Sequence, residues 1–139
     1  MTTRLFTIMD LMEAAGRAVP SLAQRVEVER VLPVQIGDLP SISIIPRRSQ
    51  PSGVGGEVQG REGMVLVIVR TGGDKPGRQA HELLSLLQAA FTTAPELNDG
   101  SVQLELGTET FRYIDTEQSI CDLQAEYEVA FNHSRESLH

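Results

Sequence analysis

The chain has 139 residues, the size of a single domain, and a chain of this length buries roughly 70% of its unfolded surface. Hydrophobic residues make up 40% and charged residues 22%, as in ordinary globular proteins, and there is no Trp. The single Cys excludes an internal disulfide and a multi-Cys zinc site. The sequence has neither a basic leader followed by an apolar stretch nor an apolar run of about 20 residues, so we expect a soluble cytoplasmic protein without a membrane partner.

The net charge of −7 is unevenly distributed. Residues 1–94 carry ten basic and nine acidic side chains, whereas residues 95–139 carry two basic and ten acidic ones. Proteins that grip nucleic acid need clustered positive charge. The acidic second half therefore argues against a nucleic-acid-binding surface.

The first third of the chain predicts one helix and two strands. Apolar residues recur at helical spacing across residues 3–19, and Pro20 follows the expected end. Residues 25–30 alternate between apolar and charged side chains, which predicts a half-buried strand. After a turn, the run from Leu39 to Ile45 predicts a second strand that ends at Pro46.

A polar, Gly-rich stretch separates this run from a second aliphatic strand at Met64–Val69. Connections of this length are uncommon in compact domains and are usually functional or disordered. We expect a long polar arm between Pro46 and Gly63 that contacts another protein; the alternative is a loop without a partner. The residues expected to make the contact are Arg47, Arg48, Val54, Glu57, Val58 and Arg61.

The second half predicts a helix and two further strands. An apolar stripe runs through residues 77–92, and a breaker at 98–100 precedes an alternating segment at 101–106. Residues 121–131 alternate most regularly, with one apolar and one polar face. We therefore expect an α+β fold, a mostly antiparallel sheet of about five strands with two helices on one face. The expected boundaries are one domain at 1–132 and a disordered tail at 133–139.

The polar face of the last strand carries Asp122, Glu126 and Glu128. One interpretation is an ordinary solvated face. The other is a channel wall, because like charges along a wall repel phosphates and keep nucleic acid from sticking.

No catalytic, cofactor-binding or metal-binding pattern is recognised. The glycines at 53–60 lack the Lys and the helix of a P-loop, and His81 has no metal-ligand spacing. Cys121 opens the apolar row of a strand and is expected to be a core thiol. We therefore expect no cofactor and no metal, and a protein that is not an enzyme.

The order of elements resembles the tail terminator (tail-completion) proteins of long-tailed bacteriophages. The resemblance covers nearly the whole chain. It rests on a first helix at Leu5–Val19, aliphatic strands at Leu39–Ile44 and Met64–Val69, a Leu-rich helix at Leu83–Phe91 and a final strand at Ala125–Phe131.

This resemblance implies a structural virion protein that assembles in the host cytoplasm. Such proteins form a hexameric ring that caps the tail tube, ends its polymerisation and provides the surface for joining the head. The implied partners are further copies of the chain, the tail tube protein and a head-completion or connector protein, with DNA passing through the ring unbound. The alternatives are a head–tail connector of the same virion region and a small α+β ligand-binding regulatory module.

Overall fold

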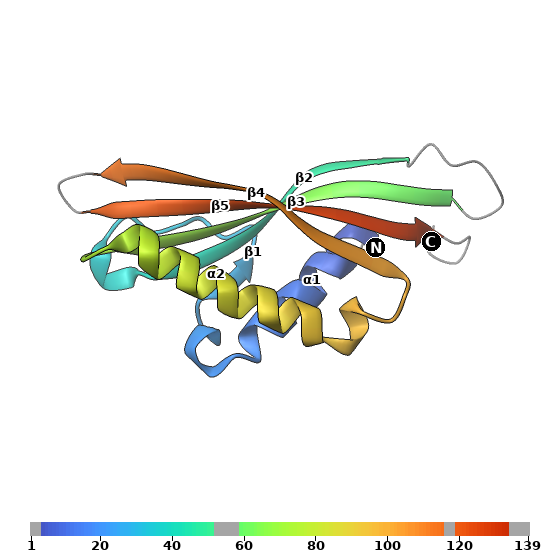
Figure 1. The fold of residues 1–139 in the computed structure, drawn as a ribbon, viewed down its shortest axis with the longest axis horizontal. Coiled ribbons are helices and arrows are strands. Elements are labelled where there is room, and N and C mark those ends of the chain that lie inside the picture. The colour runs from blue at the N-terminus through green and yellow to red at the C-terminus, as the bar shows by residue number, and fades with distance from the viewer. Residues whose placement is uncertain (1–3, 52–58, 116–118, 134–139) are drawn as a thin grey trace.

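The computed structural model describes residues 4–51, 59–115 and 119–133. Within these ranges the chain forms a five-stranded sheet and two α-helices, and both helices lie on one face of the sheet (Figure 1). The expected α+β class is confirmed. The elements are α1 (Arg4–Arg17), β1 (Val26–Val28), β2 (Ser41–Pro51), β3 (Gln59–Gly72), α2 (Pro76–Thr93), β4 (Val102–Asp115) and β5 (Ile120–His133), with short 3-10 turns at Pro20–Leu22, Ile36–Asp38 and Pro95–Leu97.

The strands lie in the order β1-β2-β3-β5-β4. All pairs are antiparallel except β1 and β2, which run parallel, so the sheet is mixed. The C-terminal ends of β2 and β4 point to opposite ends of the molecule (Figure 1). β3 and β5 pair along their whole length and form the centre of the sheet.

The two helices present the apolar stripes that the sequence predicts. The buried side chains of α1 include Leu5, Ile8 and Met12, and those of α2 include Leu84 and Leu87. Such spacing places apolar residues on one side of a helix, where the sheet can cover them. Pro76 occupies the first turn of α2, where a missing N–H costs no hydrogen bond.

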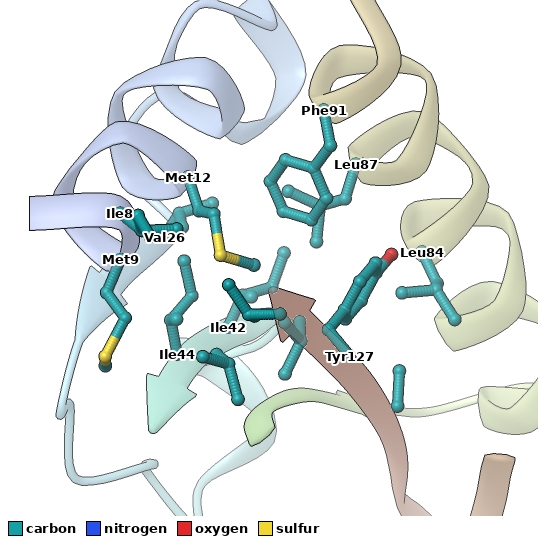
Figure 2. Close-up of a cluster of buried hydrophobic side chains, with 14 of the residues drawn as sticks. Ile8, Met9, Met12, Val26, Ile42, Ile44, Leu84, Leu87, Phe91 and Tyr127 are labelled. Carbon is teal, nitrogen blue, oxygen red and sulfur yellow. The ribbon is translucent and has the colours of Figure 1, made fainter. Parts of the chain in front are cut away.

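The core lies between the helices and the sheet. Figure 2 shows Met12 and Phe91 pointing from the helices toward Ile42 and Tyr127 on the strands. The rings of Phe91 and Tyr127 meet edge to face, with centroids 5.4 Å apart. The Tyr127 hydroxyl donates a hydrogen bond of 2.6 Å to Oε1 of Gln88, so its polar end is satisfied at the edge of the core.

The polar connection expected between Pro46 and Gly63 lies between β2 and β3, but it is shorter than predicted. β2 continues through Pro46 to Pro51, and β3 already begins at Gln59, so most of the arm is paired hairpin. The register shifts between Pro46 and Arg48, and a bulge of this kind accommodates a proline within a strand.

Two further boundaries differ from the prediction. The strand expected at 101–106 extends to Asp115, with a register shift between Leu106 and Glu109. β5 includes His133, so the expected tail does not begin there, and residues 134–139 lie outside the described ranges.

Candidate subunit interface

The predicted contact residues of the β2–β3 hairpin divide between the two faces of the sheet. Nη2 of Arg48 lies 3.3 Å from Oε2 of Glu128 on the face without helices, and both side chains are about half exposed. Arg61 follows the register of the opposite face and donates a hydrogen bond of 3.1 Å to Oγ of Ser49. Arg47 is exposed in β2. Val54, Glu57 and Val58 lie outside the described residues.

The predicted acidic stripe follows the helix-free face of β5, but its members differ in environment. Glu128 is exposed and Glu126 is partly exposed. The expectation that Asp122 lines the same open surface is wrong, because its side chain is only 6% exposed and is bonded to Arg70. Whether Glu126 and Glu128 face a channel remains a prediction.

Arg70 and Asp122 form the best-satisfied ion pair of the described residues. Nε of Arg70 lies 2.7 Å from Oδ1 of Asp122, and Nη2 lies 2.9 Å from Oδ2, so the pair is bidentate. Nη1 donates to the carbonyls of Leu32 and Pro33 at 3.3 and 3.2 Å. The hydrogen bond with Asp122 raises the pKa of Arg70 further, so the guanidinium stays charged.

These bonds hold the segment of residues 30–35 against the helix-free face; we call it the crossing segment. It carries Val31 and Val34, whose side chains are 91% and 63% exposed. Ser41 of β2 lies opposite Arg70, and its hydroxyl is buried without a hydrogen-bond partner among the described residues. The same holds for the hydroxyl of Ser43, two residues farther along β2.

The second half of β4 was missed in the sequence and is the most exposed apolar part of the sheet. The side chains of Phe111, Tyr113 and Ile114 are 45%, 60% and 49% exposed. β4 is an edge strand, and no described strand pairs with its outer side. The aromatic and β-branched content of residues 110–114 was the available signal for a strand.

A shallow hollow of about 710 Å³ lies between this half of β4 and the start of α2. The Tyr113 hydroxyl oxygen lies close to Gly77 in this hollow: a Cβ at Gly77 would be 2.7 Å from it and would displace the exposed Tyr113 side chain. Nε2 of His81 lies 3.7 Å from Oε1 of Glu109 at the rim. The expected core position of Cys121 is confirmed, because its side chain is fully buried. This burial raises the pKa of the thiol and keeps it protonated.

A second concavity of about 460 Å³ lies between α1 and the end of α2. Small apolar side chains form most of its wall, while Thr93 and Glu96 supply its polar atoms. The small wall residues are Ala14, Ala15, Ala18, Ala90 and Ala94.

In the described part of the chain, no group of three or more His, Cys, Asp or Glu side chains could hold a metal ion. Of the described helices, none is both long enough and apolar enough to span a membrane. No protein-family model matches the sequence, and a search of curated proteins finds no significant match.

Proposed function

We propose that this chain is a structural virion assembly protein, a tail terminator whose copies form a ring on the head-proximal end of a phage tail tube. The observation that carries the proposal is the open edge of β4, a 14-residue strand with three exposed apolar side chains in its second half. Open strands of this length invite pairing with another chain. The ring caps the tube, ends its polymerisation and offers the joining surface to a head-completion or connector protein.

The charge of the helix-free face supports the same role. Glu62, Glu105, Glu126 and Glu128 all follow the register of this face, and none of them is buried. Carboxylates along a channel repel the phosphates of DNA, so the genome passes without being bound. The helix-free face is therefore the channel side in the proposed ring.

The oligomeric state tests this function. Light scattering after size-exclusion chromatography, with negative-stain imaging, is expected to give a closed ring of about six times the 15.2 kDa mass of one chain. The same measurement with tail tubes added is expected to place the ring at one tube end and to stop further growth. The proposal is contradicted if the chain stays monomeric at high concentration and does not bind tail tubes. Binding to a connector or neck component in place of the tube favours a connector role in the same virion region.

The groove between the helices favours a second candidate function, a small ligand-binding regulatory module. Apolar concavities with a few polar groups are typical of small-molecule sites. A thermal shift with a metabolite, lost in Ala18→Phe and Ala90→Phe, supports this module. A metabolite screen without any shift removes it.

A further inference from the structure

Opposite charges lie at the two edges of the sheet, in the same row of paired residues. The register aligns Arg48 of β2, Met64 of β3, Glu128 of β5 and Glu105 of β4 in one row across the helix-free face. Arg48 stands at the β2 end of the row and Glu105 at the β4 end. A head-to-tail contact between two copies would bring these two ends together.

Glu105 has no favourable charged neighbour among the residues that the structure describes. It lies directly opposite Glu128, and like charges in that arrangement are destabilising. It is exposed and forms no salt bridge with any described residue, whereas Arg48 shares its charge with Glu128. An additional cation beside Glu105 would relieve the repulsion.

The edge of β2 is open at the level of this row. β1 pairs only with Ile42–Ile44, so the remainder of β2 has no described strand on that side. Prolines at 46 and 51 lack an N–H and confine new pairing to the four residues between them. Antiparallel geometry follows from the topology, because β4 runs opposite to β2 when two sheets continue with their helices on the same side.

From these observations we infer that β4 of one copy pairs with the 47–50 edge of β2 in the next copy, with Glu105 beside Arg48. The inference rests on the proposed ring and specifies its contact. The contact is heterologous, since different surfaces meet, and repeated use generates a ring. Along β4, the bulge between Leu106 and Glu109 lies next to the row in which β1 of the neighbouring copy ends at Val28, and a bulge bends its strand locally.

Charge exchange tests this contact. Glu105→Arg and Arg48→Glu are each expected to raise the concentration at which half of the chains assemble by about tenfold or more, because like charges then face each other. An equimolar mixture of the two variants is expected to assemble again, since they alternate around an even-numbered ring. Asp10→Arg, an equal charge change at an exposed position of α1 rather than on either edge of the sheet, is the matched control and leaves assembly unchanged. Matching circular dichroism spectra establish that the variants are folded.

Each outcome decides between the contact and the ring. The inferred contact is overturned if the wild type assembles and neither substitution weakens assembly, or if mixing the two variants does not restore it. The proposed ring is not affected by either result. A wild-type chain that stays monomeric with and without tail tubes overturns both.

Disulfide trapping tests the register without changing charge. Gln50 and Gln103 stand at opposite ends of the next row on the same face. The Gln50→Cys/Gln103→Cys chain is expected to form a ladder of covalent oligomers on oxidation. Gln50→Cys/Thr110→Cys, with the second cysteine displaced along β4, forms no ladder. Equal ladders from both pairs, or a ladder from the control alone, overturn the contact.

Discussion

Removing Arg70 is expected to be among the most destabilising single changes outside the apolar core. The Arg70→Met substitution leaves the Asp122 carboxylate, 6% exposed, without its cation, and it deprives the carbonyls of Leu32 and Pro33 of their donor. Breaking a buried pair from one side costs about 3–5 kcal/mol. A domain has about 5–15 kcal/mol of stability in total, so a large part of it is lost.

Urea unfolding followed by far-UV circular dichroism measures this loss, since the chain has no Trp for fluorescence. With a slope of about 2 kcal/mol per M, the midpoint is expected to fall by about 2 M. The control is Arg48→Met, which removes a half-exposed pair with a single contact of 3.3 Å and is expected to cost less than about 1 kcal/mol.

The double variant Arg70→Met/Asp122→Leu separates the ion pair from the shape of the site. It leaves no unpaired charge, so its cost is expected to be clearly smaller than the sum of the single costs. The reasoning is refuted if Arg70→Met costs no more than Arg48→Met, or if the single costs simply add.

Three further substitutions test the core and the hairpin by the same unfolding measurement. Tyr127→Phe removes the hydrogen bond to Gln88 and costs about 1 kcal/mol at pH 7. Burial raises the pKa of Tyr127 above its ordinary 10.0, so the stabilisation from Tyr127 is complete below pH 10 and declines as the pH rises above it. The difference in unfolding free energy between the wild type and Tyr127→Phe is therefore expected to narrow above pH 10, and a constant difference contradicts this. Gly63→Ala places a Cβ 2.8 Å from the carbonyl oxygen of Arg48 and costs about 1–3 kcal/mol, with faster hydrogen exchange in the hairpin; unchanged exchange argues against the close approach. Leu87→Ala empties a fully buried site and costs about 2–5 kcal/mol, and a cost below 1 kcal/mol is incompatible with the described packing.

The sequence predicted most reliably the elements whose environment is uniform along their length. β5 alternates without interruption because one face meets the helices throughout, and the buried residues of α1 and α2 follow one stripe each. The period alone therefore identified the core faces.

The failures occurred where the period is broken or where distant segments cover a residue. The bulge after Leu106 shifts the phase of β4 and concealed its second half, and the bulge at Pro46 allows a proline that resembled a strand end. Alternation placed Asp122 on the polar face correctly, but it carries no information about the crossing segment that lies over it. The β4 side of the candidate interface was missed, because it depends on which strand lies at the edge of the sheet, whereas Arg47 and Arg48 on the β2 side were among the predicted contact residues.

The central position of β5 also determines how the chain must fold. β3 pairs along its full length with β5, a strand that begins 48 residues after β3 ends. One of the two hydrogen-bonding edges of β3 therefore stays unpaired until this distant strand has been synthesised. Such non-local pairing slows folding, because a long loop must close before any contact compensates for it. During synthesis, β2 and β3 emerge as a hairpin with an unpaired apolar edge, and unpaired edges aggregate. Translation through His133 therefore completes the middle of the sheet rather than its margin, and a nascent chain halted in β4 is expected to need a chaperone.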